Sequence, residues 1–477
     1  MYTATITRIN KLSKHPNADR LQIAEMHGCQ VIVGLDTDIG DLGIFFPEDG
    51  IINLDFLLAN KALAKHPLTG EKLGGFFDEK GRVRAQLFRG ARSEGFWCPI
   101  SYLMKWAESE KIPFPDFTEG REFSTVGELT LCEKFINPRV RMKKGESTIP
   151  KLKVAKSRFS CPMQKHIDTP SFKSLRVGGM EEGDMLVVSY TTKLHGTSGR
   201  SSLLKNPAYV VPTLLDTWKQ DFLAWAFKDK KIWPTLSIFG IDWIFLFMIM
   251  MIFDAAGAKP IEPYYKWYHG TRNTTFDLIR GHSSYRAVAA ERLEEVMLPG
   301  ETWYYEIVGY DGQSTIQGGH NASSCNKEMQ KLFPGRVNYS YGCRPNQSEI
   351  YVYRINMDGQ DLPFDQIMKR CKEHNINHVP RIQEVVFQGT SDGQESYIHN
   401  VIDDMRKKVN TDKPSILDAR HPEEGIVIRI DWFRNGMFKS FAVFKDKSFV
   451  FKVMEGLAKD SGIVEDIEEE ESLIEET

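Results

Sequence analysis

The chain has 477 residues, which is enough for two or three domains with full hydrophobic cores. Hydrophobic residues make up 41% of it and charged residues 26%, as in an ordinary globular protein, and it contains no internal repeat or long low-complexity tract. The net charge of −3 excludes a uniformly basic nucleic-acid-binding protein, although the charge is distributed unevenly along the chain.

Residues 1–130 contain short apolar segments separated by Gly, Pro and Asp. The expected strands include Tyr2–Ile9, Leu21–Met26, Gln30–Val33 and Leu42–Phe46. Short strands with turns of this kind are typical of a small β-barrel.

Cysteine usage and the N-terminus indicate the compartment. Seven cysteines are scattered without a Cys-x-x-Cys pair, which argues against a disulfide framework and against a zinc site. The first twelve residues lack the apolar core of a secretion signal. We therefore expect an intracellular, cytoplasmic protein.

Charge is concentrated in two segments beyond residue 130. Lys134–Arg176 contains twelve Lys or Arg and only two acidic residues. Residues 131–158 are therefore expected to form a basic linker, which either contacts a phosphate backbone or is only a solvated connection. Residues 456–477 form an acidic tail with eight acids in its last thirteen positions, and its expected role is solubility.

An apparent insertion covers about residues 201–263 and contains the apolar run Trp243–Phe253. Eleven residues are too few to span a bilayer, and the longer segment Leu236–Phe253 is interrupted by Asp242, so no stable membrane span is expected. We interpret the run as a buried helix or strand of an accessory subdomain. A surface that binds a partner or a membrane is the alternative.

The central motif is Lys193-Leu-His-Gly-Thr197, directly after the strand-like segment Met185–Thr192. A lysine that ends a strand is ordinarily just solvated, but four further charged motifs follow in order. They are Gly270-Thr-Arg-Asn273, Trp303-Tyr-Tyr-Glu-Ile-Val-Gly309, Glu424-Gly425 before the strand-like Ile426–Ile430, and Phe441–Lys447. Five ordered motifs are much more specific than one.

This set resembles the covalent nucleotidyltransferase superfamily of polynucleotide ligases and mRNA capping enzymes, over roughly residues 160–455. Lys-x-His-Gly-Thr, in place of the commoner Lys-x-Asp-Gly, resembles the nick-sealing type of ATP-dependent RNA ligase. The resemblance implies an α+β fold, with a nucleotidyltransferase domain of antiparallel sheets and helices at residues 159–455. It also implies an OB-like domain before this domain and none after it, and only 25 residues follow Lys452.

Two N-terminal segments agree with this arrangement. His15–Leu21 and Arg89–Gly95 resemble the paired signatures of OB-like tRNA-binding domains, so residues 1–130 are expected to bind RNA, at nicks or single-stranded ends. The alternative is that His15–Leu21 is only a turn, because Pro, Asn and Asp all favour turns. Since every motif expected to contact the nucleotide follows Ser157, adenylation is expected to need only the second domain.

The resemblance implies that Lys193 attacks the α-phosphate of ATP, that AMP then passes to an RNA 5′-phosphate, and that a 3′-hydroxyl finally expels it. A lysine amine must lose a proton before it attacks, so burial and cationic neighbours are expected to lower its pKa. Lys445 and Lys447, two apart on a strand, are expected to stabilise the leaving pyrophosphate together with Mg²⁺ or Mn²⁺. A solvated strand edge is the alternative.

The resemblance assigns further residues to the nucleotide and the metal. Glu306 is expected to hold ribose or metal-bound water, and Glu424 the metal, unless either forms only a salt bridge. Arg272 is expected to contact ribose or the RNA 5′-phosphate. Tyr353 is favoured over Tyr351 as the residue that stacks on adenine.

Further residues are assigned upstream of the central motif and within it. His166 is expected near adenine. His195 is expected to position phosphate or substrate rather than metal, because imidazole is a weaker magnesium ligand than carboxylate. Gly196 is expected to contact the nucleotide, and Thr197, Ser198 and Arg200 are expected to follow on the same turn and line the nucleotide pocket.

Two other functions remain open at this point. A DNA ligase or mRNA guanylyltransferase would share the motifs, but would have an OB domain after the last lysine motif. A non-catalytic RNA-binding protein could retain the fold, but would have no need to keep Lys193.

Overall fold

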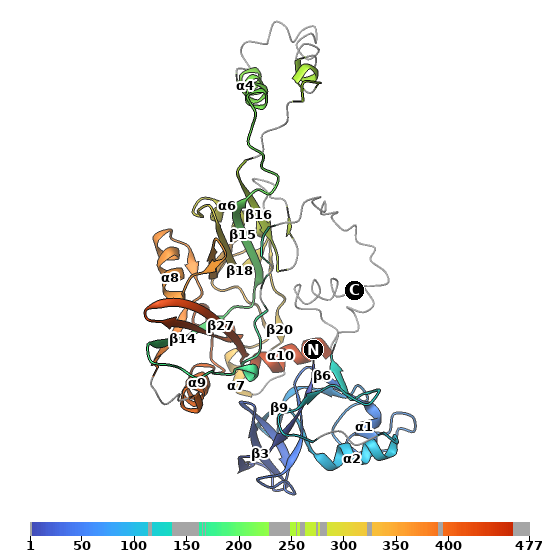
Figure 1. Ribbon diagram of the computed structural model, residues 1–477. Helices are drawn as coiled ribbons and strands as arrows, with labels where there is room; N and C mark the ends of the chain where they lie inside the picture. The colour runs from blue at the N-terminus through green and yellow to red at the C-terminus, as the bar shows by residue number, and fades with distance from the viewer. Residues whose placement is uncertain are drawn as a thin grey trace.

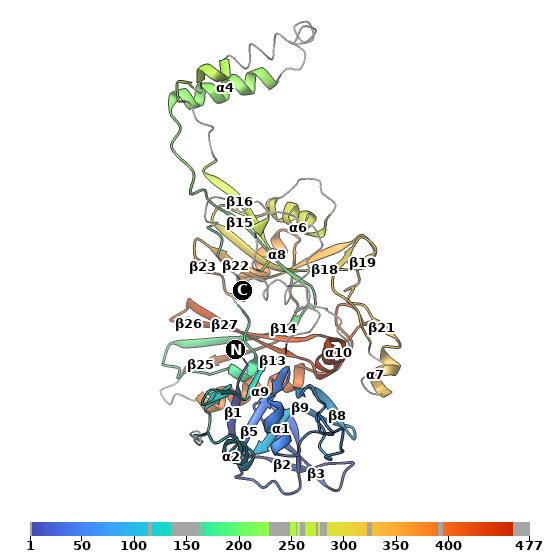
Figure 2. The ribbon, with the colours of Figure 1, turned by 90° about the vertical axis from the view of Figure 1, so that its right-hand side faces the viewer.

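The computed structural model describes residues 2–112, 117–135, 162–164, 166, 168–228, 249–253, 255–257, 263–272, 275–276, 284–321, 327–389 and 395–460. The N-terminal residues form one β-rich body, and the residues from 162 onward form a larger body with an arm that projects from its far side (Figures 1 and 2). The body before residue 136 is the N-terminal domain, and the larger one is the C-terminal domain.

The N-terminal domain is built from antiparallel sheets around an aromatic core. Its five-stranded sheet has the order β10 (Glu122–Phe123), β1 (Ala4–Arg8), β5 (Leu42–Pro47), β9 (Ala91–Pro99) and β8 (Ala85–Phe88). Its two three-stranded sheets are β2 (Leu12–Lys14), β3 (Leu21–Met26) and β4 (Cys29–Gly34), and β13 (Cys132–Lys134), β6 (Gly50–Ile52) and β7 (Arg82–Val83). Helices α1 (Leu54–Ala59) and α2 (Ile100–Ser109) contribute Phe56 and Trp106 to the core.

The four strands expected in this domain are confirmed, each within two residues at both ends. The described pairings form separate antiparallel sheets rather than one closed ring, so the OB-like barrel stays a prediction. The two signature segments lie together, because Asn17 Nδ2 donates to the Arg89 carbonyl at 3.0 Å and His15 Nε2 lies 2.9 Å from the Phe88 carbonyl oxygen.

Two main sheets form the C-terminal domain, which confirms the expected α+β class, and they are antiparallel except for one short parallel pairing at the edge of the larger sheet. The smaller sheet has the order β25 (Arg381–Gln388), β14 (Asp184–Lys193), β26 (Gly425–Arg434) and β27 (Met437–Lys447). The main path of the larger sheet is β17 (Thr275–Phe276), β16 (Tyr265–Gly270), β15 (Thr197–Lys205), β18 (Glu301–Asp311), β22 (Ser348–Met357) and β23 (Gln360–Asp361). Because β14 and β15 are consecutive, Lys193–Thr197 is the point at which the chain passes from one sheet to the other.

Helices close both sheets. Helix α9 (Glu395–Val409) packs on the smaller sheet, where the buried Tyr190 hydroxyl donates to the Ile402 carbonyl at 3.0 Å. Helices α6 (Tyr285–Glu294) and α8 (Phe364–Glu373) pack on the larger sheet around Trp303 and Val352. Helix α10 (Phe449–Asp460) directly follows β27 and lies against the N-terminal domain (Figures 1 and 2).

The expected insertion is shorter than 201–263, because β15 continues to Lys205 and β16 begins at Tyr265. Helix α4 (Leu214–Lys228) projects away from the sheet beyond the end of β15 (Figures 1 and 2). Of the apolar run, residues 243–248 lie outside the described residues, and Met251 and Ile252 are exposed rather than buried. None of the described helices is long and apolar enough to cross a bilayer.

Most of the expected basic linker (residues 136–158) and the acidic tail from residue 461 also lie outside the described residues. Strand β13 pairs with β6, so the N-terminal domain extends beyond residue 130 and includes Cys132–Lys134, which the sequence interpretation had assigned to the linker. The other domain bounds stay a prediction.

We expect Trp106→Ala to lower the free energy of unfolding of the N-terminal domain by about 3–5 kcal/mol, because it leaves a large cavity beside Phe56. Trp106 is 0% exposed, whereas Trp218 on the arm is 62% exposed. Chemical denaturation of both Trp→Ala variants checks this, and Trp218→Ala should change stability by less than about 0.5 kcal/mol. Equal effects of the two variants would contradict the packing.

Candidate active site

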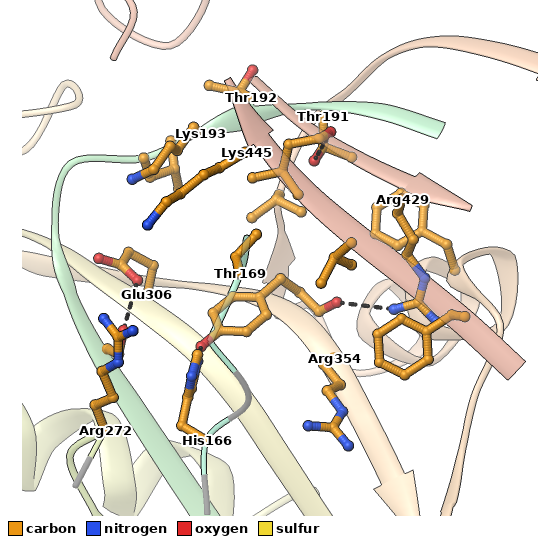
Figure 3. Close-up of a pocket in the computed structure, with 18 residues that line it drawn as sticks. His166, Thr169, Thr191, Thr192, Lys193, Arg272, Glu306, Arg354, Arg429 and Lys445 are labelled. Atoms are coloured by element: carbon orange, nitrogen blue, oxygen red, sulfur yellow. Dashed lines mark hydrogen bonds between the residues drawn. The ribbon is translucent and has the colours of Figure 1, made fainter. Parts of the chain in front are cut away.

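A cavity lies between the two main sheets of the C-terminal domain (Figure 3). The smaller sheet contributes Lys193, Arg429 and Lys445 to its wall, and the larger sheet contributes Glu306 and Tyr353. The segment before β14 and the end of β16 close it with His166, Thr169 and Arg272. Residues from four of the five ordered motifs therefore meet in one cavity.

Beside this cavity the backbone crosses from one sheet to the other, and neighbouring atoms approach it very closely at two glycines. A side chain on Gly196 would place its Cβ 2.4 Å from the Ile307 carbonyl oxygen and 2.8 Å from Glu306 Cγ. A side chain on Gly425, the register partner of Lys193, would lie 2.2 Å from the Asp446 carbonyl oxygen. Both glycines are therefore required by close backbone approach, and they let Lys193 reach the cavity wall.

Lys193 is held by a short ion pair. Its Nζ lies 2.5 Å from Glu424 Oε1, and the Glu424 side chain is only 3% exposed. The other oxygen, Oε2, lies 3.9 Å from His195 Nδ1. The amine thus points to a buried carboxylate, which is the nearest group that can accept its proton.

Lys445 supplies a second amine at the same end of the cavity (Figure 3). Burial, and then the charges of Lys193, Lys447 and Arg272, lower the pKa of Lys445 to about 8. Like charges gathered in a cavity favour a bound anion, because an anion relieves their mutual repulsion.

Lys447 is placed differently from Lys445. Both oxygens of Glu455 accept hydrogen bonds from its Nζ, at 2.8 and 2.7 Å, and Lys447 does not line the cavity. The structure therefore brings Lys445 into the wall and holds Lys447 beside helix α10.

Arg272 and Glu306 lie near the two amines (Figure 3). Ser198 Oγ donates to Glu306 Oε2 at 3.4 Å. Arg272 forms an ion pair with Asp168, and this hydrogen bond lowers the pKa of the Asp168 carboxyl. At this end of the cavity the Glu306 carboxylate lies between the amines of Lys193 and Lys445 and the guanidinium of Arg272 (Figure 3).

The other side of the cavity is aromatic. His166 Nε2 lies 2.7 Å from the Tyr353 hydroxyl. Burial, and then the charge of Arg272, lower the pKa of His166 to about 4, so the imidazole is neutral near pH 7. Tyr351 belongs to the buried core instead, so of the two tyrosines only Tyr353 faces the cavity.

Two residues that follow the central lysine lie behind the cavity wall. Thr197 and Arg200 are on strand β15, so the expected turn is wrong. Thr197 accepts a hydrogen bond from Arg286 at 2.8 Å, and Arg200 donates to the Gln164 carbonyl. Neither residue lines the cavity, whereas Ser198 does.

His195 is also buried behind the wall. Its ring centroid lies 4.7 Å from that of Tyr339 and 5.0 Å from that of Phe451, and its backbone N–H donates to the Tyr341 hydroxyl at 2.6 Å. His195 and Gly196 therefore pack behind the crossover at Lys193–Thr197 and do not form the cavity surface.

The sequence interpretation missed Arg429. Its side chain is buried, Nε donates to Asp431 at 2.8 Å, and the guanidinium lies 4.3 Å from the Phe441 ring centroid. A lone arginine in the apolar strand Ile426–Ile430 was the available signal, because a buried charge needs a partner.

Two carboxylates could hold a divalent metal. Among the described residues no group of three or more His, Cys, Asp or Glu is placed to bind one. However, Mg²⁺ keeps several waters and commonly uses one or two carboxylates plus substrate phosphates. The buried Glu424 Oε2 accepts no hydrogen bond within the described part of the chain, and Glu306 lines the cavity, so these two residues fit such an ion.

No protein-family model matches the chain, and no curated protein matches it either. The structure is similar to solved structures of an RNA ligase from Naegleria gruberi. A mutant with ATP and Mn has 14% sequence identity and a TM-score of 0.48, with 95% of this chain and 98% of that chain covered. The ligase with pyrophosphate has 14% identity and a TM-score of 0.44, with 96% and 98% covered.

We expect the affinity for ATP to fall as the pH rises through about 8, because free Lys445 then loses the charge that attracts the triphosphate. The Kd should rise about tenfold between pH 7 and pH 9. Equilibrium binding without divalent metal, which prevents turnover, measures this change. The matched control is Lys445→Arg, whose side chain stays charged and should show no such pH dependence. A flat wild-type profile would contradict the placement of Lys445.

Proposed function

We propose that this protein is an ATP-dependent RNA ligase. It joins a 3′-hydroxyl to a 5′-phosphate through a lysyl–AMP intermediate and an adenylated RNA 5′ end. The observation that supports this most strongly is the Lys193 amine, which ends a strand at a buried carboxylate and shares one cavity with Lys445, Arg272 and Glu306. The ordered motifs of the sequence lead to the same function independently.

In the first step, Lys193 Nζ gives up its proton and attacks the α-phosphorus of ATP. A phosphorus–nitrogen bond forms, the bond to the bridging oxygen breaks, and pyrophosphate leaves with that electron pair. Glu424, 2.5 Å from the amine, is the nearest proton acceptor. Lys445 and Arg272 stabilise the charge that develops on the leaving group.

In the second step, an oxygen of the RNA 5′-phosphate attacks the AMP phosphorus, and Lys193 departs and regains a proton. In the third step, the 3′-hydroxyl attacks the activated 5′-phosphate, forms the phosphodiester and releases AMP. Glu424 and Glu306 would hold Mg²⁺ or Mn²⁺, which supplies positive charge to the phosphates when bound. Tyr353 and Phe441 offer aromatic surface for the base.

The RNA partner and the compartment belong to the same proposal. The N-terminal domain and the basic stretch after it would hold the RNA backbone. The five cysteines in the described residues are free and buried, which suits a reducing intracellular compartment.

A nucleotide-labelling assay separates the proposed function from its alternatives. Incubation with α-labelled ATP or GTP and Mg²⁺ or Mn²⁺ should give a protein–nucleotide adduct from ATP alone. An adduct from GTP would indicate a guanylyltransferase, and no adduct from either would indicate a non-catalytic RNA-binding protein. Sealing of nicked RNA but not nicked DNA strands then separates RNA ligase from DNA ligase.

We expect Lys193→Ala to abolish AMP labelling, while sealing of pre-adenylated RNA survives at least in part, because that step bypasses the lysine attack. Lys193→Arg should not restore labelling, since guanidinium stays protonated and cannot attack. Lys205→Ala is the matched control, because Lys205 also ends a strand but lies outside the cavity, and its labelling should equal wild type. Labelled Lys193→Ala protein would refute the assignment.

We expect Lys445→Met to lower the rate of AMP transfer by about 100-fold or more without unfolding the domain, because a preorganised cation is lost. Lys447→Met should have a smaller effect, since Glu455 already neutralises Lys447. Single-turnover labelling and thermal melting of both variants measure this difference. Near-normal labelling by a well-folded Lys445→Met variant would dismiss the role.

A further inference from the structure

A cluster of buried charges joins the N-terminal domain to the strand that bears Lys445. Lys452 on α10 has a side chain only 10% exposed, and its Nζ lies 2.6 Å from Glu94 Oε2, 3.5 Å from Glu48 Oε1 and 3.8 Å from Asp446 Oδ1. Burial opposes the charge on Lys452, but these carboxylates outweigh it and raise its pKa well above the ordinary value. Lys452 therefore stays charged and forms ion pairs with carboxylates of both domains.

Asp446 connects this cluster to the cavity. It lies between Lys445 and Lys447 on β27, so its side chain points to the opposite face of the strand. On that face Asp446 forms ion pairs with Arg406, whose Nη1 lies at 2.6 Å, and with Lys452. Strand β27 is thus anchored on its opposite face at the residue next to Lys445.

Glu48 is also connected to β27 through Lys173 and the segment that precedes it. Its other oxygen lies 2.7 Å from Nζ of Lys173, which follows Pro170 by three residues. The Pro170 carbonyl accepts the backbone N–H of Lys445 at 2.8 Å. Burial opposes the Glu48 carboxylate, but Lys173 and Lys452 outweigh it and lower its pKa to about 2, so the carboxylate stays ionised.

The charged cluster is part of a continuous contact between the domains. Ala85 of the N-terminal domain packs with Phe449 and Val453 of α10. Arg82 Nη1 donates to the Gly456 carbonyl near the end of the same helix at 3.1 Å. Helix α10 is therefore clamped by the N-terminal domain along several turns, directly after the strand that ends in Lys447.

We propose that Glu48 and Glu94 are positioning residues for the adenylation step: through Lys452 and Asp446 they hold the strand of Lys445 in register with the cavity. The N-terminal domain then completes the nucleotide site in addition to holding RNA. This inference rests on the proposed function. It revises the expectation that a chain beginning near Ser157 suffices for adenylation, because such a chain lacks Glu48 and Glu94, the N-terminal partners of Lys173 and Lys452.

The test uses the full chain and no RNA, so that RNA binding does not enter. Glu48→Gln, Glu94→Gln and the double variant keep side-chain size while removing charge. Single-turnover AMP labelling of the double variant should have a rate constant about tenfold below wild type, as expected for a displaced catalytic group. Its final amplitude should match wild type, because amplitude counts folded protein. Glu119→Gln, an exposed carboxylate of the same domain paired with Arg8 at 3.0 Å, is the control and should label at the wild-type rate.

Each other outcome has a definite meaning. A wild-type rate constant in the double variant overturns the inference and leaves the proposed function intact. A lower amplitude with an unchanged rate constant also overturns it, because the cluster is then only structural. If the double variant does not fold, Glu94→Gln decides, since Lys452 keeps Glu48 and Asp446 there, and an unchanged rate constant sinks the inference. Absence of labelling in wild type refutes the proposed function itself.

Discussion

The ion pair between Lys193 and Glu424 is the constraint on which the rest of the site in the C-terminal domain depends. A primary amine and a carboxylate with 3% exposure, 2.5 Å apart, are placed where two sheets meet. Burying such a pair is costly unless its geometry is held firmly. The geometry of this ion pair is held by Gly196 and Gly425, which allow close backbone approach, and by the aromatic packing around His195. Lys193 is therefore preorganised before any nucleotide binds.

The two ends of the cavity divide its chemistry. Cations gather where phosphates would lie, and their mutual repulsion, added to burial, lowers the pKa of Lys445. The opposite end has Tyr353, Phe441 and a neutral His166, which suit an uncharged ring. An elongated molecule with a polyanionic end and an aromatic end would match the cationic end and the aromatic end of the cavity. Neither end depends on the arm at α4, whose exposed apolar residues lie outside the cavity.

Apolar runs in the sequence predicted some of the strands in both domains. The resemblance carried by the five ordered motifs pointed to the cavity residues Lys193, Arg272, Glu306, Tyr353 and Lys445. What the patterns could not predict depends on distant partners. Lys447 and Lys445 look alike in sequence, yet only Lys447 meets Glu455. His195 resembles a pocket residue until Tyr339 and Phe451 enclose it. The contact between Lys452 and Glu94 joins residues 358 positions apart, and no local pattern reveals it.

The central claim is that Lys193 is the residue that bonds to AMP. Wild-type protein incubated with ATP and a divalent metal, digested under conditions that preserve phosphoramidates, and examined by tandem mass spectrometry tests it most directly. The account predicts one AMP on the peptide that contains Lys193, with the fragment masses placing it on that side chain. AMP located on Lys445, on any other lysine or on no peptide would contradict it.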